Sequence, residues 1–367
     1  MAAIATAHAF RMETTYRMDN GKMVVSASIN GEKGLFILDT GAPCTVTHSF
    51  AQRAHLAAGQ STQVYDSNGN VARTQIINLP ELKLGGIGFT HLQAMQLPQG
   101  NMIEAFGVDG IIGYNLFQQG IVKFDGRAHK FILTNDTTGL GMDLNQAIVM
   151  AEDPYSVMLP IRLGNVTDTV MFDSGAVDLY EMSNRMYQRV QADTAQFRRL
   201  ASGQGILSMG AAGVEAASVK HRVLIPQCHI GNNLFANVTT ITTDAIDSRV
   251  GSELLQYGDV IIDYKQQFFY FQPHADVATP INAYQPEWDV VITVTDDHLT
   301  AGMVWDNAKG NIRSGDRIVA IGQQRIDKVD MRQATTTQLF NLDPQGTEIT
   351  FINGRTGKEE KTTISMK

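Results

Sequence analysis

Short apolar runs that stop at turn-forming residues dominate this chain and predict a mainly β protein. Residues 35–38 are apolar and run directly into Asp39-Thr40-Gly41, and residues 170–172 run in the same way into Asp173-Ser174-Gly175. A short apolar run bounded by turn residues is typical of a buried strand, and the acid that ends it then lies at the edge of a core. Two such strands could place two carboxylates side by side.

These two motifs are part of a longer internal repeat. Asp173 follows Asp39 by 134 positions, and a second pair of segments, which begin at Asp109 and Asp247, repeats at an offset of 138. The matched positions of this second pair are Gly113 with Gly251, Leu116 with Leu254, Gly120 with Gly258, Val122 with Val260, Asp125 with Asp263 and Phe131 with Phe269. A single Asp-Thr/Ser-Gly is a weak signal, but two copies of one unit explain the combined pattern better than chance does.

The repeated motifs resemble those of the pepsin and retropepsin superfamily of aspartic proteases, over roughly residues 21–272. The family pattern is an apolar strand, then Asp-Thr/Ser-Gly, and later an apolar pair followed by glycine. Ala42 and Ala176, which follow the two glycines, are more similar to retropepsins than to pepsins. One departure is Arg249, where the first copy has Ile111. The resemblance implies two homologous acid-protease-type β-barrel lobes in one chain, with the cleft between them.

The resemblance also implies a role for each residue of the two motifs. Two aspartates would form the catalytic dyad, the hydroxyls would hydrogen-bond across the interface of the lobes, and the glycines would let backbone N–H groups approach the carboxylates. These residues are, in that order, Asp39 and Asp173, Thr40 and Ser174, and Gly41 and Gly175.

Two carboxylates within a few ångströms of each other cannot both ionise, so they share one proton. The ionised group can take a proton from water while the protonated group gives one to the carbonyl oxygen of a peptide. The sequence therefore predicts an aspartic endopeptidase whose substrate is a peptide or protein. Two other readings stay open: both acids only cap loops, or the protein is an inactive protease fold that binds peptides as a scaffold.

Residues 63–74 predict a hairpin, since Asn68-Gly69 is a turn signal between strand-like residues. In the family a hairpin flap covers the substrate at about this point of the chain. Tyr65 and Gly69 are therefore candidate substrate-flap residues, and the alternative is a hairpin without such a role. The glycine-rich residues 202–218 occupy the equivalent position in the second copy.

Two helices are expected, one in each repeat. Ser49 is a suitable N-cap for a helix that Gly59 would end, and Ser183 precedes a helical pattern over residues 184–200.

The domain organisation that these patterns predict has four parts. They are an N-terminal protease lobe (11–145), a C-terminal protease lobe (146–273), a linker (274–287) and a PDZ-like domain (288–367). The last part reads as an independent unit of strands around one helix, 331–342, which Asp330 would cap.

The most specific resemblance to PDZ domains is the segment SGDRIVAIGQQRI at residues 314–326. The family's Gly-Leu-Gly-Phe loop is not visible before residue 290. An extended peptide could still bind by strand addition beside residues 290–294.

Composition narrows the function classes. At 367 residues with 43% hydrophobic and 18% charged residues, the chain is long enough for two or three folded domains and is not of a disordered class. The net charge of −8 and the lack of a Lys/Arg cluster argue against nucleic acid as a partner, and no apolar run approaches the length of a membrane span. No His-Glu-x-x-His, G-x-S-x-G or suitably placed GxGxxG motif occurs, so we expect no metal and no cofactor.

The remaining expectations concern the thiols, the assembly and the compartment. Cys44 and Cys228 read as two buried thiols, with a disulfide or a catalytic cysteine as the alternative. Since one chain carries both half-sites, we expect a monomer. The pattern Ala7-His8-Ala9, together with the family resemblance, favours an extracytoplasmic protein, periplasmic or secreted.

Overall fold

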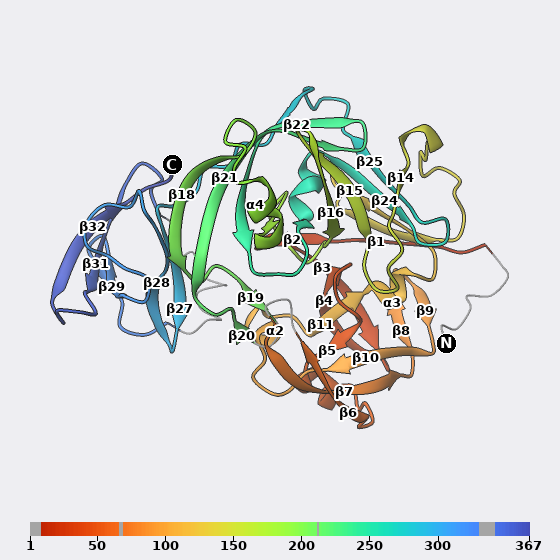
Figure 1. Cartoon of the computed structure of the whole chain (residues 1–367). Coiled ribbons are helices and arrows are strands. Elements are labelled where there is room, and N and C mark those ends of the chain that lie inside the picture. Colours follow the sequence, from red (N-terminus) through yellow and green to blue (C-terminus); the bar gives the residue numbers. More distant parts are fainter. Residues whose placement is uncertain (1–8, 66–68, 211–212, 330–341) are drawn as a thin grey trace.

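The computed structural model describes residues 9–65, 69–210, 213–329 and 342–367 and is mainly β, as the sequence predicts (Figure 1). The helices among the described residues are short: α1 (His48–Arg53), α2 (Met102–Ala105), α3 (Tyr114–Phe117) and α4 (Asn184–Val190), with 3-10 turns η1 (Leu144–Gln146) and η2 (Ser252–Gln256). The Ala7-His8 pair, Asn68 of the predicted turn, Asp330 and most of the predicted helix 331–342 lie outside the described residues. Among the described residues no helix is long and apolar enough to cross a membrane.

The first repeat forms a ten-stranded sheet that carries the first Asp-Thr-Gly motif. Its strands, in spatial order, are β6 (Gln60–Tyr65), β7 (Val71–Leu79), β10 (Leu92–Gln96), β5 (Thr45–Val46), β11 (Gly110–Gly113), β4 (Glu32–Asp39), β3 (Lys22–Ile29), β8 (Leu82–Leu84) and β9 (Ile87–Phe89), and β2 (Arg17–Asp19) pairs with β3. The hairpin β3–β4 turns at Asn30 and Gly31, both with positive φ, so β4 runs from this turn to Asp39 at its last position.

A six-stranded sheet joins the two repeats. Its order is β1 (Arg11–Thr15), β13 (Lys130–Thr134), β12 (Ile121–Asp125), β24 (Gly258–Asp263), β25 (Phe268–Pro273) and β14 (Ile148–Val149). Where β12 meets β24, Lys123 faces Ile261, and on either side Val122 faces Ile262 and Phe124 faces Val260. Lys123 and Ile261 are themselves 138 positions apart, so each residue of β12 in this pairing has its repeat equivalent on β24. An approximate two-fold axis therefore passes through the Lys123–Ile261 pair and relates the two repeats.

The second repeat and the C-terminal strands share one further sheet. Its main path is β23 (Arg249–Val250), β16 (Val166–Phe172), β15 (Met158–Leu163), β21 (Ser218–Ile230), β18 (Arg198–Gly205), β28 (His298–Trp305), β29 (Arg317–Ile321), β31 (Thr347–Ile352) and β32 (Glu359–Ile364). Branches are β22 (Asn233–Thr243), β17 (Met182–Ser183), β26 (Ile281–Asn282), β27 (Val290–Thr295) and β30 (Gln324–Arg325), and β19 (Met209–Gly210) pairs separately with β20 (Gly213–Val214).

The C-terminal strands form one end of the molecule beside β18 (Figure 1). Residues 288–367, expected as an independent unit, enclose a hydrophobic cluster of their own. They are nevertheless tied to the second repeat, because β28 pairs antiparallel with β18, and Gly203, for example, faces Trp305. Within the expected linker, β26 pairs with β22. The sheet therefore continues from the second repeat into the C-terminal strands.

Both predicted helices are shorter than expected. Thr47, not Ser49, caps α1, because its Oγ1 accepts the N–H of Phe50, whereas the Ser49 hydroxyl turns to Glu104. The helix then ends at Arg53, since His55 has a left-handed backbone (φ 51°) that breaks the helical path. The predictions of helices reaching Gly59 and residue 200 are wrong.

Ser183 does cap α4, as expected, but the helix ends at Val190. A turn follows in which the Asp193 carboxylate accepts a hydrogen bond from the backbone N–H of Gln196. Strand β18 then starts at Arg198.

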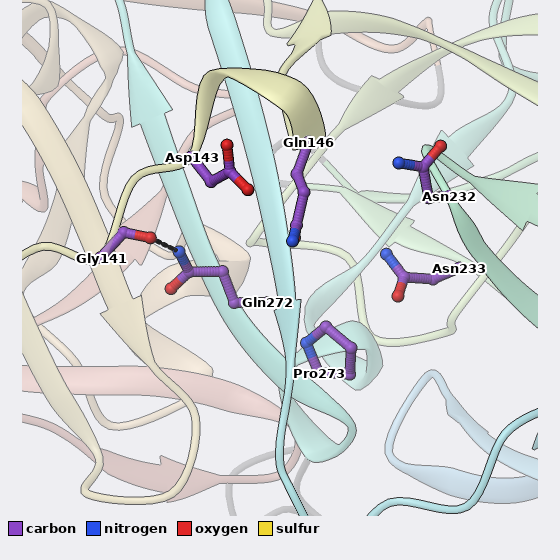
Figure 2. A pocket seen from close by; sticks show the side chains of 7 residues that line it. All are labelled: Gly141, Asp143, Gln146, Asn232, Asn233, Gln272 and Pro273. Atoms are coloured by element: carbon purple, nitrogen blue, oxygen red, sulfur yellow. Dashed lines mark hydrogen bonds between the residues drawn. The ribbon is translucent and has the colours of Figure 1, made fainter.

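A cavity of about 550 Å³ lies at the outer end of the six-stranded sheet (Figure 2). Its lining is polar and consists of Gly141, Asp143, Gln146, Asn232, Asn233, Gln272 and Pro273. The Asp143 carboxylate already accepts from Asn145, and Gln272 donates to the carbonyl of Gly141. The cavity contains no residue of the two Asp-Thr/Ser-Gly motifs, so we assign it no part in their chemistry.

Candidate active site

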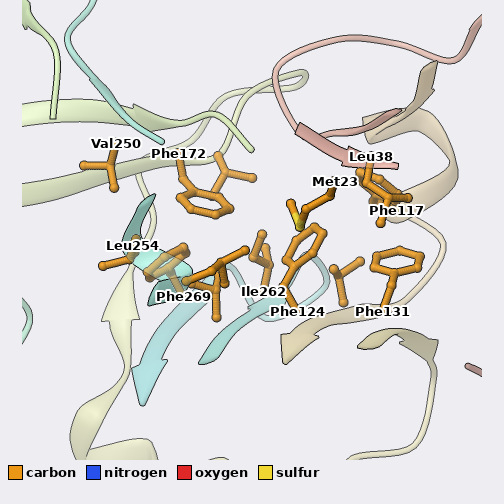
Figure 3. Close-up of a cluster of buried hydrophobic side chains, with 14 of the residues drawn as sticks. Met23, Leu38, Phe117, Phe124, Phe131, Phe172, Val250, Leu254, Ile262 and Phe269 are labelled. Carbon is orange, nitrogen blue, oxygen red and sulfur yellow. The ribbon is translucent and has the colours of Figure 1, made fainter. Parts of the chain in front are cut away.

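The two acids stand at the ends of strands that are anchored in one hydrophobic core. Leu38 and Phe172, the residues just before Asp39 and Asp173, are fully buried. Both belong to one cluster, which also contains aromatic residues of the six-stranded sheet such as Phe124 (Figure 3). Burial of a side chain of this size contributes about 1.5–3 kcal/mol. The core therefore fixes the positions at which the two carboxylates leave it.

A parallel strand supports each acid from behind. Strand β11 pairs with β4 so that Gly113 faces Asp39, and β23 pairs with β16 so that Val250 faces Phe172. The N–H of Asp173 then donates to the Val250 carbonyl at 2.9 Å. The apolar-glycine segments of the sequence thus pack next to the acids of their own repeats, as the resemblance implied.

Thr40 and Ser174 connect the two motifs through four hydrogen bonds. The N–H of Thr40 donates to Ser174 Oγ at 3.0 Å, and the N–H of Ser174 donates to Thr40 Oγ1 at 2.9 Å. Each hydroxyl donates in turn to the carbonyl before the opposite acid, Thr40 to Phe172 at 2.7 Å and Ser174 to Leu38 at 3.1 Å. Both side chains are fully buried, so these bonds lock the two strand ends against each other.

Each glycine of the motifs packs against the opposite carboxylate. A Cβ added to Gly41 would lie 2.8 Å from Asp173 Cγ, and one added to Gly175 would lie 2.5 Å from Asp39 Cγ. Glycine is therefore the only residue that fits at either position. The N–H of Gly41 donates to Asp39 Oδ1 at 2.8 Å, and that of Gly175 to Asp173 Oδ1 at 2.9 Å.

The two carboxyl groups interact directly, and this changes the titration of Asp39. Desolvation, and then the charge of Asp173, raise the pKa of Asp39 to about 7, and a hydrogen bond between the two side chains adds to this shift. The hydrogen bond from the Gly41 N–H and the positive charge of Lys22 lower the pKa of Asp39, but by less. A pair of carboxyl groups in this state holds one proton near neutral pH.

Two cations, Lys22 and Arg249, lie beside the two carboxyl groups. Lys22, at the start of β3, donates to the carbonyl of Gly175. Arg249 Nη1 lies 3.6 Å from Asp173 Oδ2, and its Nη2 lies 2.6 Å from Glu181 Oε2. The sequence identified Arg249 as a departure from the repeat but gave no reason to connect it with Glu181, which is 68 positions away.

The predicted flap residues lie on a hairpin that meets its counterpart from the second repeat. Strands β6 and β7 form the hairpin; Tyr65 is 75% exposed at the end of β6, and Gly69 has a left-handed backbone (φ 77°). Next to Gly69, Asn70 Nδ2 donates to the carbonyl of Val214 at 3.1 Å. The hairpins that follow the two acids along the chain therefore touch near their tips.

A buried ion pair holds the second hairpin at its base. Lys220 Nζ lies 2.7 Å from Glu215 Oε2 and 2.9 Å from Asp244 Oδ2. Glu215 Oε1 accepts the backbone N–H groups of Leu207 and Ser208, so the segment before β19 is bound to the segment after β20. Both Lys220 and Glu215 are buried, and sequence reasoning gave no sign of this pair.

The described residues contain no group of three or more His, Cys, Asp or Glu that could hold a metal ion. Cys44 and Cys228 are buried free thiols and form no disulfide. Burial raises the pKa of Cys44 to about 11 and that of Cys228 to about 12, so both stay protonated at neutral pH.

Comparison with known proteins adds one finding to this geometry. No curated protein matches the chain. A family model described as aspartyl protease matches residues 25–116, a span that holds Asp39, the hairpin β6–β7 and the supporting strand β11. This match supports the placement of the chain in an aspartyl protease family.

Proposed function

We propose that this protein is an aspartic endopeptidase in which Asp39 and Asp173 activate a water molecule to hydrolyse a peptide bond. The observation that carries the proposal is the direct contact of the two carboxyl groups, which leaves one proton between them near neutral pH. The reciprocal bonds of Thr40 and Ser174 support it, since they hold the dyad rigid.

In the proposed reaction, the ionised carboxylate takes a proton from water while the water oxygen attacks the peptide carbonyl carbon. The protonated carboxyl group gives its proton to the carbonyl oxygen, so the intermediate is a neutral gem-diol. Collapse of this diol breaks the C–N bond, and the amine leaves with a proton returned through the dyad. One water is consumed, and the dyad ends with the single proton with which it began.

The other parts of the chain take supporting roles in this proposal. Residues 11–145 and 146–273 act as the two lobes, and the hairpin with Tyr65 and Gly69 covers the substrate. Residues 288–367 act as a PDZ-like domain, joined through 274–287, that binds or presents peptide. Because one chain carries both half-sites, the enzyme works as a monomer, and we place it outside the cytoplasm.

A mixed library of peptides, incubated at acidic and neutral pH with and without pepstatin, tests the proposal. Pepstatin-sensitive cleavage by the wild-type protein supports it. Peptide binding without cleavage at any pH would reject it and would favour the inactive peptide-binding scaffold. Asp173→Asn serves as the control, because it keeps the shape of the site and removes one member of the dyad.

A further inference from the structure

The buried guanidinium of Arg249 makes the environment of the dyad unequal. Arg249 is 7% exposed, and it lies on β23, which pairs with β16, the strand that ends just before Asp173. Its backbone exchanges both N–H···O bonds with Glu181, at 2.9 and 2.8 Å, so the two side chains start from adjacent points. The Glu181 carboxylate then holds Nη2 at 2.6 Å while Nη1 lies 3.6 Å from Asp173 Oδ2.

The first repeat has no counterpart to this cation. The position equivalent to Arg249 is Ile111 on β11. Ile111 pairs with Ile37, two residues before Asp39, and Arg249 pairs with Met171, two residues before Asp173. Ile111 is buried among apolar side chains, including Ile37. The first repeat therefore has an apolar side chain at the position from which Arg249 reaches Asp173.

The other charged groups around the dyad do not cancel this difference. Lys22, from β3, lowers the pKa of Asp39, but desolvation and the charge of Asp173 outweigh it. From the end of β24, Tyr264 stays neutral, because desolvation and then the charge of Asp39 raise the pKa of its phenol.

Asp178 is a further charged group near the dyad, and it interacts with Glu181, the partner of Arg249. Desolvation, and then repulsion from Glu181 and Glu253, raise the pKa of Asp178 to about 7, although its exposed side chain lets water limit the effect. The charges that act on Asp178 include Glu181 but neither aspartate of the dyad, so Arg249 remains the cation in contact with the dyad.

We propose that Arg249, held in place by Glu181, fixes Asp173 as the ionised member of the dyad and leaves the shared proton on Asp39. This inference rests on the proposed function and adds the assignment that the repeat alone leaves open. Asp173 is then the base that takes the proton from water, and Asp39 is the acid that protonates the carbonyl oxygen. Arg249 touches neither the substrate nor the water in this scheme and is a positioning residue.

Two variants move the charge around Asp173 in opposite directions. Arg249→Met with Glu181→Gln removes the cation and its partner together, which avoids a buried unpaired charge. Loss of the cation makes ionisation of the dyad less favourable, so both limbs of the pH profile of kcat/KM move up by about one pH unit. Glu181→Gln alone leaves the Arg249 charge uncompensated, and both limbs move down.

A matched control carries the same substitutions at a remote ion pair. Arg325 and Glu359 form an exposed pair on β30 and β32, so Arg325→Met with Glu359→Gln leaves the pH profile in place. Arg249→Lys keeps the charge and holds the limbs nearer to those of the wild type than the Met variant does. A purely structural role for Arg249 would lower activity without moving the two variants in opposite directions.

Carbon NMR of the protein labelled at the Asp carboxyl carbons follows the loss of each proton with pH and does not need activity. The Asp39→Asn and Asp173→Asn variants assign the two signals. We expect Asp173 to lose its proton at lower pH than Asp39, and the gap to narrow in the Arg249→Met/Glu181→Gln protein. If the wild type cleaves peptides but the limbs and the gap do not move, the inference is overturned and the proposed function stands. If the gap behaves as expected but no peptide is cleaved, the proposed function fails with the base and acid roles, and only the assignment of the proton to Asp39 holds.

Discussion

The N–H of Thr40 donates to the hydroxyl of Ser174, and the N–H of Ser174 donates to the hydroxyl of Thr40, across 134 positions of the sequence. Each hydroxyl accepts the backbone N–H of the other residue. Both residues are fully buried, so these N–H groups are hydrogen-bonded without water. The two acids are consequently positioned by one shared set of bonds in addition to the supporting strand of each repeat.

Replacement of Thr40 by Val tests this shared set. Val keeps the shape but leaves the N–H of Ser174 without an acceptor, and we expect the free energy of unfolding to fall by about 1–3 kcal/mol in urea titrations. Ser174→Thr is the matched control, since the first repeat already has Thr at the equivalent position. A Thr40→Val protein as stable as the wild type would mean that these bonds contribute nothing to the joint.

The glycines of the motifs are expected to be as sensitive as the acids. An Ala at position 175 must displace the Asp39 carboxylate, and a displacement of about 1 Å can lower a catalytic rate by about 100-fold. The measurement is kcat/KM on a peptide substrate for Gly175→Ala. Gly346→Ala is the control, because its added Cβ meets one side-chain methyl of Thr363 at 3.2 Å and lies in the turn before β31. Equal rates for the two variants would contradict the packing at Gly175.

The raised pKa of Asp39 predicts an unusual dependence of stability on pH. The pKa rises from 3.8 to about 7 on folding, so between these values the folded state holds a proton that the unfolded state has released. The contribution of Asp39 to stability is therefore complete below about pH 4 and is lost as the pH rises through about 7. Urea unfolding of the wild type and Asp39→Asn from pH 4 to 8 should show this decline in the wild type only. The same pH dependence in both proteins would rule out a raised pKa at Asp39.

The buried Lys220–Glu215 pair is expected to be costly to break. Lys220→Met leaves Glu215 buried without its cation and should reduce the free energy of unfolding by about 3–5 kcal/mol. Lys220→Met with Glu215→Gln should recover most of this loss, because Gln can still accept the N–H groups of Leu207 and Ser208. Hydrogen exchange of residues 206–210 reports whether the hairpin base loosens in the single variant. If the single and double variants are equally stable, the ion pair does not hold this base.

The joint between β18 and β28 predicts that the C-terminal strands are needed for stability. A chain that ends at residue 287 would leave the edge of β18 unpaired at Gly203 and would expose Ala201, which packs in a cluster with Met303 and Trp305. We expect this shortened protein to unfold at a lower temperature than the full chain and to aggregate. An unchanged Tm and a monomeric elution profile would show that the rest of the chain folds without the C-terminal strands.

The sequence predicted those features of the site that repeat. The two motifs and the apolar-glycine segments share their offsets, and so the pairing of β4 with β11 and of β16 with β23 could be expected before the structure was known. The mainly β fold followed from the same short apolar runs. These signals are strong because a repeated unit imposes the same local packing twice.

Features that occur once could not be predicted in this way. The contact of Arg249 with Glu181 depends on two chain segments whose residues have no common pattern, and the pairing of β18 with β28 joins segments about 100 positions apart. The predicted bounds of α1 were wrong because a cap two residues earlier, Thr47, and a left-handed His55 outweighed the serine and glycine signals. Tertiary context decided each of these points.

The central claim is that two aspartates share one catalytic proton, and a single assay tests it most directly. Cleavage of an unfolded protein substrate is measured for the wild type, Asp39→Asn and Asp173→Asn under the same conditions, with circular dichroism to verify that each protein is folded. We predict that the wild type cleaves and that each Asn variant, folded but without one member of the dyad, does not. Full activity in either variant would contradict the dyad.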